Sequence, residues 1–282
     1  MKPWIGIRRS LLTALGWCFE SDRSGNWDVW TKDLTTGEES NLTATPVDER
    51  FAVVSADGSR VAYMALREGA ALNDLYVVLG RGGMATKLCD GCANLSDWSP
   101  DGQSLIIRSA ARETHRNQVS LFTVNSGETI TLLTEEVYVA ETRFSPDGRW
   151  LAFHTVDAVR ERRQVFIAPF RTTNLPIERG EWIPITDGLE SDGLAAWSPN
   201  GNLLYFLSDR DGYRCIWAQR LEPGRKRPIG APIEVYHLHF VGRSLVNMNL
   251  GDIGLSVARN KIAIAVRETS GNIWLRQAAR RD

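Results

Sequence analysis

The sequence predicts an all-β protein, a six-bladed β-propeller whose blades are four-stranded antiparallel sheets. Three observations predict this fold: a turn motif that recurs along the chain, apolar strands on both sides of each turn, and an aromatic residue that returns in a third strand. Six units of about 45 residues fill the 282 residues of the chain, so we expect one propeller domain over residues 1–282.

The recurring turn is an apolar residue followed by Ser, Pro, Asp and Gly. It is intact at residues 99–102 and 145–148, nearly intact at 55–58 and 198–201, and worn at 256–259, with starts 44, 46, 53 and 58 residues apart. In a type I turn with a glycine bulge, Ser bonds back to the backbone, Pro presets a negative φ and Gly supplies a positive φ. We therefore expect a positive φ at Gly58, Gly102, Gly148 and Gly201.

The strands around each turn follow from apolar spacing. The first strand of a unit ends at the apolar residue before Ser, and apolar residues six and eight positions after Ser share one face of the second strand. A short fourth strand ends several units with Leu-Thr or Ile-Thr. The third strand is marked by Trp30, Tyr76, Phe122, Phe166, Trp217 and Trp274.

The ends of the chain are less regular than its middle. The six units lie at approximately 11–46, 47–92, 93–138, 139–188, 189–240 and 241–282. The last unit has no fourth strand of its own, and an exposed edge invites aggregation. We therefore expect residues 4–8 to pair with residues 273–276 as the outer strand of the last blade. The alternative is a signal peptide, since a basic stretch precedes a short apolar run in residues 1–19.

Composition excludes several classes of function. The formal net charge of −1 gives no global field that would attract nucleic acid or an anionic membrane. No apolar run approaches the roughly 18 residues of a membrane span. Four cysteines do not make a disulfide scaffold and leave the redox compartment open. We expect a monomer. The N-terminal sequence favours the cytoplasm, with the periplasm as the alternative.

Tandem units with this turn, a second strand such as residues 150–153 and an aromatic third strand resemble the TolB-type propeller repeat, which is related in shape to WD-repeat propellers. The resemblance covers residues 17–277. That repeat also occurs in the propellers of tricorn and prolyl-oligopeptidase-like peptidases and in sensor-like modules of bacterial regulators. The resemblance therefore implies the fold, and it implies a binding or sensing role more readily than a particular reaction.

Two motifs raise the question of metal or redox chemistry. Cys89 and Cys92 have the spacing of a redox pair or of half a zinc site, but a second pair is missing, which favours an inter-blade connection with incidental thiols. His237 and His239 would share a strand face, which suits a metal, but no third ligand is patterned nearby. We expect no metal site and no cofactor.

Other motifs are explained by the repeat. The segments 19–25 and 206–212 both contain Phe, Ser-Asp-Arg and Gly, and lack the further spacing of a calcium loop. No Gly-x-Ser-x-Gly sequence is present, so nucleophilic catalysis has no support and we expect no catalytic residue.

A basic cluster is the one surface feature that suggests a ligand. The loops between the second and third strands of units three and four are long and basic, and adjacent blades would place them side by side on one rim. They could bind an acidic partner, or they could be a solvated, partly self-paired rim. The candidate binding residues are Arg112, His115, Arg116, Arg160, Arg162 and Arg163.

The sequence therefore favours a non-catalytic module that binds a ligand, peptide or protein at the mouth of the central channel. Its default site is the face formed by the loops before the first strand and after the second strand of each blade. Such a binding module is consistent with a detached sensor or interaction domain of a larger bacterial regulator. The alternative is a propeller enzyme, a lyase or hydrolase, with a knot of His, Asp and Glu in the channel.

Overall fold

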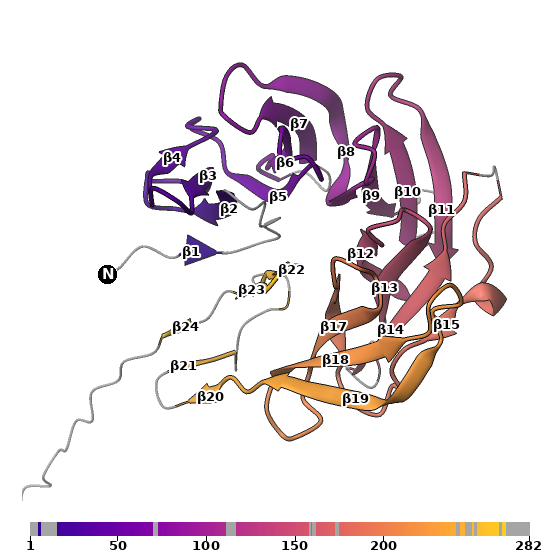
Figure 1. The fold of residues 1–282 in the computed structure, drawn as a ribbon. Helices are drawn as coiled ribbons and strands as arrows, with labels where there is room; N and C mark the ends of the chain where they lie inside the picture. Colours follow the sequence, from indigo (N-terminus) through magenta and orange to yellow (C-terminus); the bar gives the residue numbers. More distant parts are fainter. Residues whose placement is uncertain are drawn as a thin grey trace, which may run out of the picture.

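The computed structural model describes residues 5–6, 16–69, 73–110, 117–157, 159, 162–172, 175–240, 243–245, 250, 253–264 and 267–268. Within these residues the chain folds into antiparallel sheets that follow one another around a common centre (Figure 1). The 3-10 helix η1 (Arg179–Glu181) is a single turn, in the connection between the last two strands of the fourth blade. Among the described residues, no helix has the length and apolar character needed to cross a membrane.

Five four-stranded blades are present, and each runs from the inner strand outward in chain order. Blade one contains β1 (Ile5–Gly6), β2 (Gly16–Ser21), β3 (Asp28–Asp33) and β4 (Glu39–Asn41). Blade two contains β5 (Glu49–Val54), β6 (Arg60–Ala65), β7 (Asn73–Leu79) and the first part of β8 (Thr86–Trp98). Blade three contains the rest of β8, β9 (Ser104–Ala110), β10 (Asn117–Thr123) and β11 (Thr129–Glu135).

The other two blades follow the same order. Blade four contains β12 (Tyr138–Phe144), β13 (Trp150–Asp157), β14 (Arg162–Pro169) and β15 (Ile183–Pro184). Blade five contains β16 (Gly193–Trp197), β17 (Leu203–Ser208), β18 (Cys215–Leu221) and β19 (Pro228–Tyr236). Strand β8 pairs with β7 through residues 86–93 and with β9 through residues 94–98, so one uninterrupted strand joins blades two and three.

The prediction of six blades is wrong, because the described residues form five. The predicted sixth unit gives a two-stranded sheet of β22 (Leu255–Ala258) and β23 (Lys261–Ile264). It also gives β21 (Arg243–Ser244) and β24 (Arg267–Glu268), which form a separate sheet with β20 (His239–Phe240) from the end of the predicted fifth unit. The worn turn closes differently from the turns of blades two to five. Without Pro, Asp and Gly, Ser256 lies inside β22, and the hairpin closes through two residues, with Asn260 at a φ of 62°.

The first strand of the chain has a different partner from the predicted one. Ile5 and Gly6 pair with Ser21 and Glu20, so β1 is the inner strand of blade one. Its predicted partner, the segment 273–276, lies outside the described residues, as does Trp274. The inner strand of blade one therefore lies before residue 11, where the first repeat unit was predicted to begin.

The repeated turn has the predicted geometry in blades two to five. Gly58, Gly102, Gly148 and Gly201 have φ values of 67–73°. The N–H of each glycine donates to the carbonyl oxygen of the motif serine at 2.8–2.9 Å. The serine Oγ accepts the backbone N–H five residues later at 2.9–3.0 Å, which holds the two ends of the turn together.

The aromatic residues of the third strands pair with aromatic residues of the second strands in four blades. The pairs are Phe19 with Trp30, Tyr63 with Tyr76, Phe153 with Phe166, and Phe206 with Trp217. In blade three the pairing is shifted by two residues relative to these four blades. Phe122 pairs with Leu105, whereas Ile107 pairs with Ser120.

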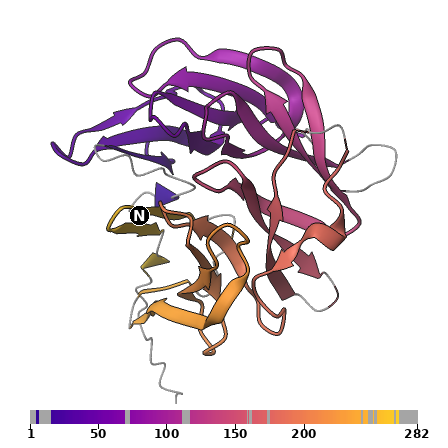
Figure 2. The same cartoon turned by 45° about the vertical axis from the view of Figure 1, so that its right-hand side comes forward.

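Apolar clusters between neighbouring sheets hold the blades together. One cluster joins blades one and two, one joins two and three, one joins three and four, and one joins four and five. A fifth cluster contains Phe19 of blade one, Leu194 of blade five and Leu255 of β22. The β22–β23 hairpin therefore packs between blades five and one, where the ring closes (Figure 2).

Candidate functional site

A cavity lies where the first and second strands of several blades are joined by the repeated turn. Its volume is about 380 Å³, and we call it the turn-end cavity. The wall comes from blades two to five and from β22. Its lining residues are Val54, Ala56, Asp97, Trp98, Pro100, Arg143, Phe144, Ser145, Pro146, Ala196, Trp197, Pro199, Ser256, Val257, Ala258 and Arg259. It therefore lies at the opposite end of the strands from the face expected as the default site.

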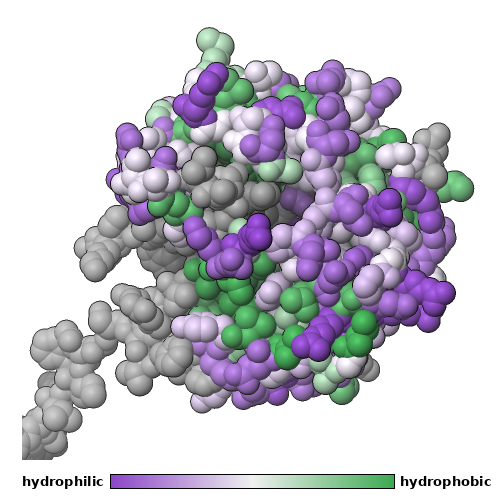
Figure 3. Space-filling model, in the orientation of Figure 1, coloured by the Kyte–Doolittle hydropathy of each residue, from purple (hydrophilic) through white to green (hydrophobic). Residues whose placement is uncertain are grey.

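The wall of the turn-end cavity is mainly apolar. Trp98, Phe144 and Trp197 are buried and precede the serine of each turn, so the motif that closes the blade also supplies the wall. Asp97, Arg143 and Arg259 are the charged lining residues. An apolar wall with a few fixed polar groups is typical of a ligand-binding pocket. In the space-filling view of Figure 3, which shows one face of the molecule, apolar surface gathers toward the lower centre.

Two of the charged groups are held by contacts between blades. The Phe144 N–H donates to Asp97 Oδ2 at 2.9 Å, which joins blade four to blade three. Arg143 Nη1 donates to the Leu255 carbonyl at 2.6 Å, which joins blade four to β22. Neither Asp97 nor Arg143 was among the site residues predicted from the sequence. A usable signal was present, because each stands two positions before a motif serine, where an inner strand is otherwise apolar.

A β-bulge bends the inner strand of three blades at the same repeat position. Phe51, Glu141 and Leu194 each stand four residues before a motif serine and have φ values of 54–59°. The pairing register shifts at each of them. At the first bulge, the buried Glu20 carboxylate of blade one accepts the Phe51 N–H at 2.7 Å and Arg50 Nε at 3.1 Å. The bulge therefore turns backbone donors toward the neighbouring blade.

The predicted basic cluster is described only in part. Arg162 and Arg163 begin β14, at the end of the blade opposite the turn-end cavity, and Arg163 Nη1 donates to Ser191 Oγ at 3.1 Å. The other four predicted binding residues, Arg112, His115, Arg116 and Arg160, lie outside the described residues. Whether the six residues gather on one rim stays a prediction.

The two Ser-Asp-Arg turns have a structural role. Arg23 lies over the Trp30 ring and Arg210 over the Trp217 ring, with guanidinium carbons 4.8 and 5.0 Å from the ring centroids. The Nε of each arginine donates to the serine two residues earlier, at 3.0 and 2.9 Å. These contacts hold the connection between second and third strands against the aromatic third strand, and they account for the motif without calcium.

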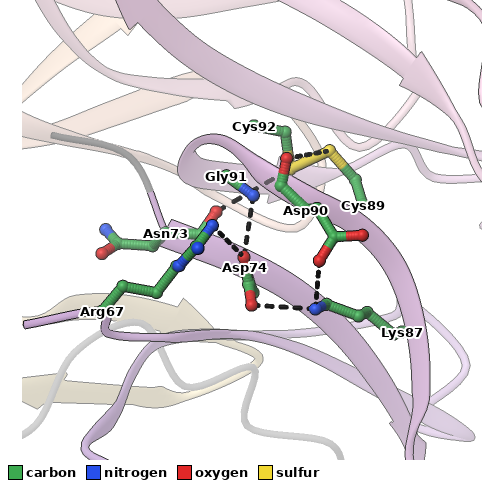
Figure 4. Close-up of a disulfide and its surroundings, with 8 residues drawn as sticks. All are labelled: Arg67, Asn73, Asp74, Lys87, Cys89, Asp90, Gly91 and Cys92. Atoms are coloured by element: carbon green, nitrogen blue, oxygen red, sulfur yellow. Dashed lines mark hydrogen bonds and ion pairs between the residues drawn. A yellow bond between two sulfur atoms is a disulfide. The ribbon is translucent and has the colours of Figure 1, made fainter. Parts of the chain in front are cut away.

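The two cysteines of the Cys-Asp-Gly-Cys motif form a disulfide on β8 (Figure 4). The pair is half-buried. Asp74 of β7 lies beside it, accepting the Gly91 N–H at 2.8 Å and contacting Lys87 Nζ at 2.9 Å. The interpretation as two incidental thiols is therefore wrong. Cys18 and Cys215 are buried thiols outside the disulfide.

A second group of potential ligands lies in blade five. Asp211, Cys215 and His237 place one ligand atom each within 4.8 Å of one another. The sequence predicted that His237 and His239 share a strand face. This prediction is wrong, because His237 follows β19 and His239 begins β20. Burial is the main cause that raises the pKa of the Cys215 thiol, and a hydrogen bond from the Leu238 N–H acts in the opposite direction by lowering this pKa.

Comparison with known proteins connects this architecture to a family. Residues 24–256 match the family model described as the tricorn protease N-terminal beta propeller domain. The chain is 27% identical over 189 residues to an uncharacterized peptidase, YuxL, of Bacillus subtilis (strain 168); the match covers 54% of this chain. The chain spans 27% of the length of that relative.

Solved structures agree on the fold. A putative TolB from Agrobacterium tumefaciens has a TM-score of 0.68 and 14% identity, covering 96% of this chain and 92% of that one. TolB from Acinetobacter baumannii has a TM-score of 0.63 and 16% identity over 83% of this chain and 55% of that one. The tricorn protease has a TM-score of 0.63 and 17% identity over 90% of this chain and 24% of that one. The TolB-type resemblance is confirmed, and the chain belongs to the family of the tricorn protease N-terminal β-propeller domain.

Proposed function

We propose that this chain is a non-catalytic binding domain whose turn-end cavity takes a peptide segment that carries apolar side chains and a carboxylate. The observation that carries the proposal is the wall itself, in which two tryptophans, a phenylalanine and three prolines surround about 380 Å³. Burial of apolar side chains in such a wall supplies the driving force for association.

The charges in the wall favour an acidic segment. Two arginines, Arg143 and Arg259, stand against one carboxylate, Asp97. Asp97 also accepts the Phe144 N–H, so part of its negative charge is already compensated. Arg259 is exposed, and its planar guanidinium can take a carboxylate through two parallel hydrogen bonds. The ligand class is therefore an apolar peptide segment with an acidic side chain or a terminal carboxylate.

A propeller enzyme is the second candidate function. The similarity to a protein named as a peptidase favours it, although this chain spans about a quarter of that protein. The described lining of the turn-end cavity favours binding. It contains two serines and one carboxylate but no histidine, so a nucleophile there lacks the imidazole base of a serine hydrolase. A sensor or interaction domain of a bacterial regulator would use the same cavity.

A peptide selection with a blocked variant tests the proposal. Random peptides displayed on phage are selected on the wild type, and the best sequence is synthesised. Ala56→Trp places an indole at the exposed mouth of the cavity, while Met84→Trp adds one to an exposed loop of the same blade. We expect Ala56→Trp to weaken binding by about tenfold or more, Met84→Trp to leave it unchanged, and the peptide to be recovered intact. Equal binding by both variants, or cleavage of the peptide by the wild type, would overturn the proposal.

A further inference from the structure

The cluster of Asp211, Cys215 and His237 has the composition of a transition-metal site. Asp211 lies in the turn between β17 and β18, Cys215 begins β18, and His237 follows β19. His237 Nδ1 is 3.3 Å from Cys215 Sγ and 2.9 Å from Asp211 Oδ2. Thiolate, imidazole and carboxylate together are ligands that suit Zn²⁺, a borderline-soft cation.

Two of the three distances between the donor atoms are close to those of a tetrahedral zinc site. With Zn–S near 2.3 Å and Zn–N or Zn–O near 2.0–2.2 Å, tetrahedral angles put N and S about 3.5 Å apart and N and O about 3.3 Å apart. In the structure the N–S distance is 3.3 Å and the N–O distance is 2.9 Å, so both are shorter by a few tenths of an ångström. Small side-chain rotations would therefore open the cluster around an ion without moving the strands.

A fourth side chain orients the imidazole. His237 Nε2 lies 2.6 Å from Glu234 Oε1, so Glu234 can hold the proton on Nε2. With that tautomer, the Nδ1 lone pair faces Cys215 and Asp211. Histidines that bind metals usually donate their other ring N–H to a carboxylate in this way.

The burial of the cluster suits an ion with one open position. Cys215 is fully buried, whereas the side chains of His237 and Asp211 are 32% and 23% exposed. An ion could enter from the solvent side, and water could complete the coordination. The buried thiol would lose its proton to solvent on binding, so affinity should fall at acid pH.

We infer that Asp211, Cys215 and His237 form a site for Zn²⁺ or a similar thiophilic divalent cation, positioned by Glu234. The ion would tie the turn after β17 to the start of β18 and to the chain leaving β19. This inference does not depend on the proposed peptide site, which lies at the other end of the strands. The alternative is that His237 is held between the carboxylates of Asp211 and Glu234, with no ion.

Titration of the protein with Co²⁺ tests the inference, because a cobalt–thiolate bond gives a charge-transfer band in the near ultraviolet. We use the double variant in which Cys89 and Cys92 are both replaced by serine, so that these sulfurs cannot contribute. We expect one ion per chain and a band that Zn²⁺ removes by competition. The band should be lost when Cys215→Ser is added and kept when Cys18→Ser is added, which alters the other buried thiol.

Two further variants protect the test against misfolding of Cys215→Ser. Asp211→Asn keeps a side-chain oxygen for the Tyr213 N–H, and should weaken the affinity for Co²⁺. Glu234→Gln should weaken it by about 10- to 100-fold. Absence of a stoichiometric thiolate band in the double variant, or a band that survives Cys215→Ser, overturns the inference and leaves the ion-pair interpretation.

Discussion

Single residues of the repeated turn determine how the first and second strands of a blade are joined. The motif serine accepts a backbone N–H from the second strand, and its hydroxyl donates to the motif Asp or Asn at 2.5–2.8 Å. At Asp57, hydrogen bonds from Ser55 and Ser59 lower the carboxyl pKa to about 2. Asp57 is therefore ionised at neutral pH, and it holds Ser55 in place through the hydrogen bond from the serine hydroxyl.

We expect Gly148→Ala to lower the free energy of unfolding by about 1 kcal/mol, because an alanine side chain is sterically strained at a φ of 68°. A β-carbon there would meet Pro100 at no closer than 3.6 Å, so the cost comes from the backbone. Urea unfolding measures the difference. Gly180→Ala is the control, since Gly180 lacks a positive φ and has open space around it. Equal effects of the two substitutions would contradict the assigned turn.

Glu49 should make stability depend on pH. Burial is the main cause that raises the pKa of its carboxyl to about 7, against hydrogen bonds from Thr45 and Thr43, and the neighbouring Asp28 raises it further. In the unfolded chain the pKa is about 4.3. The folded state therefore binds the extra proton between these values, and stability is lost as the pH rises from about 4 to 7.

We expect Glu49→Gln to remove this loss and to be more stable than the wild type at pH 8, by an amount on the order of 3 kcal/mol. Thermal unfolding of both proteins from pH 4 to pH 8 measures the effect. Glu38→Gln, at an exposed position of the neighbouring blade one, should leave the pH profile unchanged. A wild-type stability that rises between pH 5 and pH 7 relative to Glu49→Gln would contradict the raised pKa.

At the scale of single elements, β8 combines two blades and a disulfide. The disulfide closes a loop of four residues, Cys89 to Cys92, so its effect on the unfolded chain is small. We expect replacement of both cysteines by serine to cost about 2 kcal/mol or less. Urea unfolding with and without a reductant measures it. The reductant should destabilise the wild type and leave the double variant unchanged; an equal effect on both would contradict a role for this bond.

The elements that sequence predicted well are those with local chemistry. A Ser-Pro-Asp-Gly sequence has few other conformations, so the turns could be predicted with their positive φ values. The bulges could not, because Phe51, Glu141 and Leu194 share neither size nor polarity. The pairing of Phe122 with Leu105 could not be predicted either, because an apolar strand fits equally well when its register shifts by two residues, which keeps the same side chains on the same face.

At the scale of the whole molecule, the number of blades depends on contacts that no repeat motif encodes. A count of turns treats the worn copy at Ser256 as a blade, yet the segment forms a short hairpin that packs between blades five and one. The turn-end cavity was missed for a related reason. Its charged residues, Asp97, Arg143 and Arg259, come from three different units and meet only when the ring is formed.

Closure of the ring should depend on Phe19, whose side chain is 2% exposed in the cluster that joins blades one and five. We expect Phe19→Ala to cost about 3–5 kcal/mol and to speed hydrogen exchange in blades one and five before the others. Phe153→Ala is the matched control, since Phe153 is fully buried between blades three and four. Faster exchange in the same blades for both variants would contradict a closing role for Phe19.

The proposed function places a peptide in the turn-end cavity. Hydrogen exchange followed by mass spectrometry, with and without the selected peptide, tests it most directly, because it locates the footprint. We expect slower exchange at residues 97–100, 143–146 and 196–199, with no change in the fragments that cover residues 108–116 and 157–163. Slower exchange confined to residues 108–116 and 157–163 would contradict it.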